Sequence, residues 1–253
     1  MNGDLKDFAR YEKQVLFKPI GLAGQKKLAK AKIGIVGSGA LGSNLANILT
    51  RSGIGHILLV DRDRVELSNL QRQMLFTEKD VGHPKAIRAA RRLAKINSEI
   101  IIEGFHQEIT HENFHELFSG CDLIFDGTDN FPTRFMMNRA TQDMGLPWIF
   151  SGVTASSGQS MMIVPEKTAC LGCVIDEQNL DATFPTVHNS GIITSIVTII
   201  ASISAITGIK YLIDREIDRT VKFYDAWVHQ FSKFEVEPAE SCHFCRPDKL
   251  RRK

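Results

Sequence analysis

The chain has 253 residues, of which 43% are hydrophobic, and a formal net charge of +2. This composition is sufficient for the core of one large domain, and the balanced charge lacks the basic excess typical of nucleic-acid or anionic-membrane surfaces. The charged first residues lack the apolar segment of a secretion signal. We therefore expect a cytoplasmic protein with neither a membrane nor a nucleic acid as its partner.

The first part of the sequence alternates short apolar strands with helices. A charged helical lead-in spans 1–30, where Gly21 and Gly24 are interpreted as turns before a Lys-rich helix over 25–32. A nucleotide-binding core is expected over 31–150. Its expected strands are 33–36, 57–60, 100–105, 123–125 and 148–150, and its expected helices are 41–51, 84–96, 113–118 and 135–144. Such alternation predicts a Rossmann-like α/β fold with a doubly wound, mainly parallel sheet.

Residues 151–253 are expected to complete the same single domain. A strand over 159–164 and a C-terminal antiparallel extension of the sheet are predicted. The uncharged segment 191–209 is long enough to cross a bilayer. Its many serines and threonines favour a buried helix instead, in the core or at a dimer interface.

A glycine-rich turn, Gly37-Ser38-Gly39-Ala40-Leu41-Gly42, lies between the first expected strand and its helix. Gly37 permits a tight turn, Gly39 lets the backbone approach a phosphate, and Gly42 lets the helix pack close to the sheet. Asp61 ends the next expected strand, where a carboxylate can accept hydrogen bonds from a ribose. The unit predicts a bound nucleotide and fits NAD and ATP equally well.

Polar residues further along the chain separate these two nucleotides. Adenylation brings a carboxylate against the α-phosphate and releases pyrophosphate, so it needs cations around the phosphates and a carboxylate for Mg²⁺. The chain supplies four suitable side chains: Asn69, Arg72, Lys85 and Asp129. Taken singly, Arg72 and Lys85 are better explained as solvated surface charges, and Asp129 as a helix cap. Together they favour ATP, because a dehydrogenase needs none of them.

Four of the five cysteines form two CxxC pairs. Cys170, Cys173, Cys242 and Cys245 suit a tetrahedral Zn²⁺ site. Four protein ligands leave no open coordination position, so the expected role is structural; a redox-active pair or two reduced pairs without a metal are the alternatives. Cys121 precedes an apolar strand and is interpreted as a small buried residue.

These motifs together resemble those of the MoeB/ThiF/HesA family, the bacterial and archaeal relatives of ubiquitin-activating enzymes. The resemblance runs from Arg10 to Arg246. Besides the glycine turn, it rests on Arg10-Tyr11, Val60-Asp61-Arg62-Asp63, Ser68-Asn69-Leu70-Gln71-Arg72-Gln73, Gly82-His83-Pro84-Lys85 and Asp126-Gly127-Thr128-Asp129-Asn130. The Ser68–Gln73 run and the pair Asp129-Asn130 are specific, whereas the glycine turn is not.

The resemblance implies a ThiF-type homodimer that adenylates the C-terminal glycine of a small ubiquitin-like sulfur-carrier protein ending in Gly-Gly. ATP and Mg²⁺ would be its cofactors, beside Zn²⁺. By position, it assigns the ribose to Asp61, the nucleotide wall to Gly39 and Ala40, the phosphates to Ser68, Asn69, Leu70, Gln71, Arg72 and Lys85, and the magnesium to Asp129 with Asn130 nearby.

Two positions depart from the family pattern. Lys13 stands where a family arginine usually reaches the phosphates of the partner subunit; lysine keeps the charge but loses the bidentate fork. Val187 stands where several members carry a cysteine that takes up the carrier covalently. We therefore expect the reaction to stop at the acyl-adenylate, with sulfur supplied by a separate donor. Gly152 and Gly158 match the family pattern where the carrier's tail is threaded.

Three other functions remain open at this point. The missing cysteine keeps open the adenylation of a peptide C-terminus or a modified tRNA base. A nicotinamide-dependent oxidoreductase would explain the glycine turn and Asp61 but not the later cations. A catalytically inactive scaffold would be consistent with Lys13, Ala40 and Val187. The sequence does not select among molybdopterin synthesis, thiamine synthesis, tRNA thiolation and protein modification as the pathway.

Overall fold

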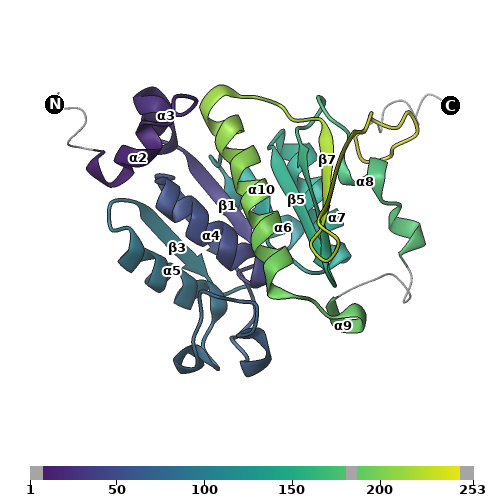
Figure 1. Ribbon diagram of the computed structural model, residues 1–253. Helices are drawn as coiled ribbons and strands as arrows, with labels where there is room; N and C mark the ends of the chain where they lie inside the picture. Colours follow the sequence, from purple (N-terminus) through teal and green to yellow (C-terminus); the bar gives the residue numbers. More distant parts are fainter. Residues whose placement is uncertain (1–7, 181–186, 246–253) are drawn as a thin grey trace.

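The computed structural model describes residues 8–180 and 187–245, which form one eight-stranded sheet in the order β3-β2-β1-β4-β5-β6-β7-β8 (Figure 1). The first five strands run parallel and the last three are antiparallel. They are β1 (Lys32–Val36), β2 (His56–Val60), β3 (Ile101–Phe105), β4 (Leu123–Asp126), β5 (Trp148–Thr154), β6 (Ser157–Ile163), β7 (Thr220–Asp225) and β8 (Gln230–Glu235). The predicted α/β fold with a C-terminal antiparallel extension is confirmed.

Helices cover both faces of the sheet (Figure 1). One face carries α3 (Gly21–Leu28), α4 (Ala40–Ser52), α5 (Lys85–Ile96) and α10 (Thr194–Asp214), and the other carries α6 (His111–Phe118) and α7 (Phe131–Met144). The strands are apolar on both sides because each face buries its own core: Leu123 and Phe125 belong to one cluster, and Ile124 belongs to the other. The short elements are η1 (Ala9–Tyr11), α2 (Glu12–Val15), η2 (Leu67–Asn69), η3 (Glu78–Asp80), α8 (Leu171–Val174), η4 (Glu177–Asn179) and α9 (Val187–Ser190).

Helix α10 is long and apolar enough to cross a membrane, but 61% of its most apolar stretch is buried in the protein. It packs against α4, β5 and β6. Its Ser204 hydroxyl forms 2.8 Å hydrogen bonds with the hydroxyls of Ser151 and Ser160, so the polar group is satisfied inside the core. A Cβ on Gly208 would lie 2.3 Å from the Phe125 ring, which explains the small residue there. The helix therefore packs as the expected core helix.

Two predicted helices have different limits in the structure. The helix expected over 25–32 is α3, which already contains Gly21 and Gly24 and ends before Lys32 enters β1. Gly24 is a packing position and not a turn, since its Cβ would lie 3.2 Å from Ile213 of α10. Helix α7 begins before residue 135 because the Asn130 side chain accepts a 3.0 Å hydrogen bond from the Thr133 N–H and caps it.

Candidate active site

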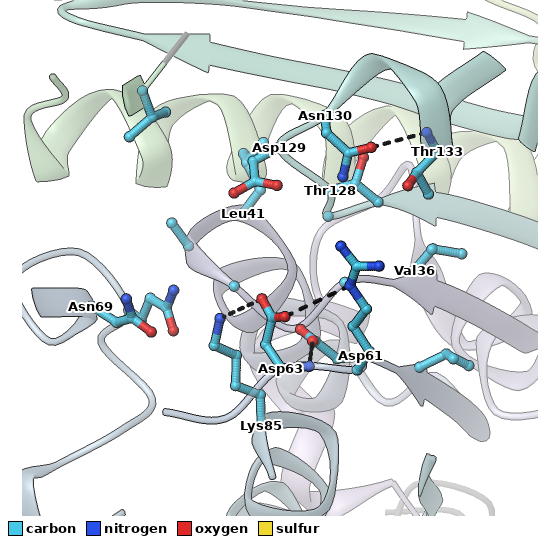
Figure 2. Close-up of a pocket in the computed structure, with 18 of the residues that line it drawn as sticks. Val36, Leu41, Asp61, Asp63, Asn69, Lys85, Thr128, Asp129, Asn130 and Thr133 are labelled. Atoms are coloured by element: carbon cyan, nitrogen blue, oxygen red, sulfur yellow. Dashed lines mark hydrogen bonds and ion pairs between the residues drawn. The ribbon is translucent and has the colours of Figure 1, made fainter. Parts of the chain in front are cut away.

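A cavity of about 460 Å³ opens beyond the carboxyl ends of β1, β2 and β4 (Figure 2). From β1 the chain proceeds outward through β2 and β3, then crosses to β4 on the other side of β1. The loops that follow β1 and β4 therefore diverge, which creates the switch point where open α/β sheets bind ligands. The volume lies in the range of small-molecule and cofactor sites.

The glycine turn forms the floor of this cavity by close backbone packing. Gly37 has a φ of +87°. A Cβ on Gly42 would lie 1.8 Å from the Gly37 carbonyl oxygen, and one on Gly127 would lie 2.5 Å from the same atom. At Gly39, in contrast, the nearest atom to such a Cβ is 3.6 Å away, so its backbone is open to the cavity. Gly37 and Gly42 thus have the steric roles predicted for them, although Gly42 packs behind the wall.

Asp61 joins the glycine turn to the loop after β2. Its buried carboxylate accepts hydrogen bonds from the backbone N–H groups of Ser38 at 2.6 Å and Asp63 at 2.7 Å. Burial raises the pKa of Asp61, and these two hydrogen bonds oppose that effect. Each carboxylate oxygen retains acceptor capacity for a ligand hydroxyl. Asp61 therefore organises the cavity as well as offering an acceptor to it.

Two cationic side chains enter the cavity from the connection between β2 and α5. Lys85, at the start of α5, is only 6% exposed, and its Nζ lies 3.1 Å from Asp63 Oδ2 (Figure 2). Arg72 Nη1 donates a 3.0 Å hydrogen bond to the Ser68 carbonyl, which leaves its remaining N–H groups for other acceptors. Asn69 is buried beside them. Its Oδ1 accepts a hydrogen bond from the Glu66 backbone N–H.

Asp129 enters from the loop after β4, on the other side of the cavity (Figure 2). The cap of α7 is its neighbour Asn130 and not Asp129 itself. Within the described residues, no hydrogen bond or ion pair engages the exposed Asp129 carboxylate. A carboxylate with free oxygens opposite cations is the arrangement that a magnesium–phosphate group requires.

Three residues of the predicted phosphate-binding run lie outside the cavity wall. The Ser68 carbonyl accepts the hydrogen bond from Arg72, and the Ser68 hydroxyl donates to Glu66 Oε2 at 3.3 Å and accepts from Asn69 Nδ2 at 3.4 Å. Leu70 packs against the hydrophobic core. Gln71 accepts hydrogen bonds from the Thr194 hydroxyl with both its backbone and side-chain oxygens, and so ties the loop to α10. These residues position the loop that carries Arg72. The predicted residues that do line the cavity are Gly37, Gly39, Ala40, Asp61, Asn69, Arg72, Lys85, Asp129 and Asn130.

The two departures from the family pattern lie in different places. Lys13 on α2 has a side chain that is 84% exposed, pairs with Glu12 at 3.4 Å and stays outside the cavity of its own chain. Val187, the first residue of α9, lies in the cavity wall. The wall therefore carries an aliphatic side chain where the resemblance predicted a cysteine in several relatives.

Arg134 is a cavity residue that the sequence reasoning missed. It is 5% exposed. Its Nε lies 2.9 Å from Asp126 Oδ2, and its Nη2 donates to the carbonyls of Thr128 at 2.7 Å and Ser151 at 2.9 Å. The guanidinium thus links β4, the Asp129 loop and β5. Its place one turn after the cap residue Asn130 was the available sequence signal.

Gln73 is a second missed residue, although it closes the recognised Ser68–Gln73 run. Its side chain is 3% exposed and lines the cavity over Gly39. Among the residues that the structure describes, its Oε1 has no hydrogen-bond partner. A buried unsatisfied acceptor costs about 1–3 kcal/mol, so a donor on a bound ligand would be favoured at this point.

A narrower groove of about 130 Å³ continues from the cavity across β5 and β6. Phe131, Arg134 and Val153 line both spaces. The groove wall includes Gly152 and Gly158, the two glycines that matched the family pattern. At Gly152 the absence of a side chain lets an extended segment approach the backbone, whereas a Cβ on Gly158 would point at Ile200 of α10, 2.6 Å away.

A buried carboxylate holds the loop that carries the cations. Asp80 is fully buried and accepts hydrogen bonds from Thr77 N–H at 2.8 Å and Arg88 Nε at 2.7 Å, and it also pairs with Arg92. Burial alone would raise the pKa of Asp80, but the N–H group and the two arginines together lower it to about 2. The network anchors the loop to α5 next to Lys85.

We expect the Asp80 network to lose its stabilising effect in acid. Because the folded pKa of about 2 lies below the unfolded value of 3.8, the contribution is complete above about pH 4 and disappears as the pH falls towards 2. Urea unfolding of the wild type and Asp80→Asn should differ by about 2 kcal/mol or more at pH 6, and this gap should narrow below pH 4. A gap that is constant from pH 6 to pH 2.5 would contradict the assignment.

The two CxxC pairs meet in one cluster. Cys170 Sγ lies 3.5 Å from Cys242 Sγ and 3.8 Å from Cys173 Sγ, and Cys173 Sγ lies 3.5 Å from Cys245 Sγ. Sulfur atoms around a tetrahedral zinc with 2.3 Å bonds are about 3.8 Å apart. Hydrogen bonds from Cys170 and Cys245 lower the pKa of the Cys173 thiol. The donor set and the spacing therefore fit zinc.

Cys121 is separate from this cluster. It is buried before β4, at the end of the strand opposite the cavity. Burial raises the pKa of its thiol to about 12. All five cysteines of the chain are thus placed, and none of them lines the cavity.

The fold and the cavity define a class of nucleotide-binding α/β proteins with an adenylation-type site: two cations face a carboxylate that has no partner among the described residues, above a glycine turn. The ThiF family model matches residues 11–244, and the chain belongs to the ThiF family. The predicted family resemblance is thereby confirmed.

Curated relatives and solved structures agree with this assignment. The sulfur carrier protein ThiS adenylyltransferase of Bacillus subtilis is 39% identical, over 94% of this chain and 70% of that protein. Its Escherichia coli counterpart is 32% identical, over 95% of this chain and 96% of that protein. The crystal structure of E. coli MccB with ATP has a TM-score of 0.81 at 25% identity, and covers 93% of this chain and 74% of that chain. The chain is accordingly an adenylyltransferase, which disfavours the oxidoreductase interpretation.

Proposed function

We propose that this enzyme uses ATP to adenylate the C-terminal glycine of a small ubiquitin-like sulfur-carrier protein ending in Gly-Gly, with release of pyrophosphate. The observation that carries the proposal is the continuity between the nucleotide-sized cavity and the glycine-walled groove over β5 and β6. The groove leads to the cavity where Arg134 lies. Relatives named for action on sulfur-carrier proteins support the same substrate class.

In the proposed reaction, a carboxylate oxygen of the carrier's terminal glycine attacks the α-phosphorus of ATP. A new C–O–P bond forms, the bond between the α-phosphorus and the bridging oxygen breaks, and pyrophosphate leaves with the electron pair. The nucleophile is already ionised at neutral pH, so no general base is required. Arg72 and Lys85 stabilise the negative charge that develops on the phosphates, and Asp61 holds the ribose hydroxyls.

Asp129 fits a magnesium ion, because its carboxylate is exposed to the cavity and has no described protein partner. Bound Mg²⁺ would neutralise phosphate charge. The side-chain oxygen of Asn130 caps α7, and this hydrogen bond fixes the direction of the loop that presents Asp129. The protein's own contribution is thus a preorganised carboxylate on one wall and two cations on the other.

The reaction is proposed to end at the acyl-adenylate. Val187 offers no nucleophile in the cavity wall, and the raised pKa of buried Cys121 disfavours its thiolate. A separate protein would supply sulfur. We further propose a cytoplasmic homodimer in which Lys13, exposed on α2, reaches the phosphates of the partner's site.

We propose a structural Zn²⁺ for the four-cysteine cluster. The expected result of prolonged chelation is a fall in Tm, because the cluster joins α8 to the segment before residue 246 through Cys242 and Cys245. Metal analysis should give at least one zinc per chain before chelation, and the Cys242→Ser variant should lose the zinc of the cluster. An unchanged Tm after complete zinc removal would contradict a structural role.

The proposed reaction is tested by ATP–pyrophosphate exchange with Mg²⁺ and a panel of small ubiquitin-like proteins ending in Gly-Gly. Exchange should require one carrier and should vanish when that carrier lacks its last glycine. ATP binding without exchange for any carrier would favour a substrate other than a carrier protein. Failure to bind ATP would overturn the proposal.

A further inference from the structure

Two histidines and an aspartate converge on the surface between α6 and α7, outside both the cavity and the four-cysteine cluster. His111 and His115 lie one turn apart on α6, and Asp143 lies near the end of α7. One ligand atom from each of the three side chains lies within 4.8 Å of the others. The adenylation reaction assigns no role to this group.

The positions of the side chains suit metal chelation. His111 Nε2 lies 3.2 Å from Asp143 Oδ2, and the two imidazole centroids are 5.8 Å apart. A spacing of four residues places both imidazoles on one face of the helix, as in helical histidine pairs that bind zinc. Ligand atoms around a tetrahedral ion with bonds of about 2.1 Å are about 3.4 Å apart, so movement of an exposed side chain by about 1 Å would complete the site.

The donor set indicates the class of ion. Two imidazole nitrogens and one carboxylate oxygen suit Zn²⁺, Ni²⁺ or Cu²⁺, whereas Mg²⁺ and Ca²⁺ prefer oxygen ligands alone. The side chains of His111 and Asp143 are 48% and 59% exposed, so an ion can enter and water can complete its coordination. We propose that His111, His115 and Asp143 form a binding site for a divalent transition-metal ion, distinct from the cysteine cluster.

The bound ion would link two elements that line the active-site cavity. The loop before α6 contributes Gln107, Glu108 and Ile109 to the wall, and α7 contributes Phe131 from its first turn. An ion that joins the start of α6 to the end of α7 stabilises the folded arrangement of both, since it binds the folded chain and not separated helices.

The test uses the full chain with zinc already loaded in the cysteine cluster, titrated with Ni²⁺ in a calorimeter. We expect saturable Ni²⁺ binding to the wild type, and at least about tenfold weaker binding to His111→Gln and His115→Gln. The matched control is His56→Gln. His56 Nε2 lies 2.5 Å from Glu103 Oε2, yet this histidine belongs to no three-ligand group in the described part of the chain.

A second measurement follows Tm with and without Ni²⁺. Ni²⁺ should raise the Tm of the wild type and of His56→Gln by the same amount. It should not raise the Tm of His111→Gln or His115→Gln. Binding and Tm shifts that are equal in all four proteins would overturn the proposal, as would a wild type that binds no Ni²⁺. The outcome is independent of ATP–pyrophosphate exchange, so a failure here leaves the proposed reaction untouched.

Discussion

Replacing Asp129 with asparagine should lower ATP–pyrophosphate exchange by about 10²- to 10³-fold while the protein remains folded. Asparagine keeps the size of the side chain but removes the charge that the proposed Mg²⁺ requires. Because Asp129 has no described side-chain partner, its replacement breaks no observed hydrogen bond or ion pair. The loss should therefore be one of activity, measured with saturating carrier and ATP, and accompanied by a higher Mg²⁺ requirement.

Asp214→Asn provides the matched control for this substitution. Asp214 is an exposed carboxylate at the end of α10 that pairs with Lys27 at 3.5 Å, outside the cavity wall. Its replacement should leave exchange within about twofold of the wild type, since exposed ion pairs contribute little. If Asp129→Asn retained exchange at the level of this control, Asp129 would have no part in the reaction.

Replacing Arg134 with methionine should lower the free energy of unfolding by about 3–5 kcal/mol. Asp126 is fully buried and would keep a charge without its partner, and the carbonyls of Thr128 and Ser151 would lose their donors. Urea unfolding measures the change. Adding Asp126→Asn to the variant should restore part of the stability, because it removes the unpaired charge.

Arg139→Met is the corresponding control on the same helix. Arg139 pairs with Glu177 at 2.6 Å, but its side chain is 46% exposed. Its loss should cost about 1 kcal/mol or less. An Arg134 variant as stable as this control would show that the buried pair is not what joins β4, the Asp129 loop and β5.

The predicted site residues that the structure brings to the cavity were found from local chemistry. Gly37 and Gly42 were assigned from a strand, a turn and a helix that are consecutive in sequence, and the packing of these glycines follows from that order. Asp61 was found because the next strand ends there. The rule that parallel strands end at one edge of the sheet predicted a common site for Arg72, Lys85 and Asp129. All three line the same cavity.

The parts that were missed depend on partners distant in sequence. Arg134 reads as an ordinary helix residue until β5 places the Ser151 carbonyl beside it. That the Gln73 side-chain oxygen is buried without a described hydrogen-bond partner becomes visible only when the fold places this amide over Gly39 of the glycine turn. Gly24 was mistaken for a turn because its contact, Ile213 of α10, lies far along the chain. Strands β7 and β8 were not placed individually, since β7 is only partly buried and β8 is mostly exposed, which weakens the alternation of a buried strand.

The sequence by itself determined the α/β class, the glycine turn, the paired cysteines and the family, because these depend on periodicity and on residues close together in the chain. Only the tertiary structure decided which polar residues face the cavity and which merely hold its loops, as the contrast between Arg72 and Gln71 illustrates. It also decided that His111, His115 and Asp143 meet. The physical reason is that both outcomes depend on packing between separate helices and strands, which fixes the direction of each side chain.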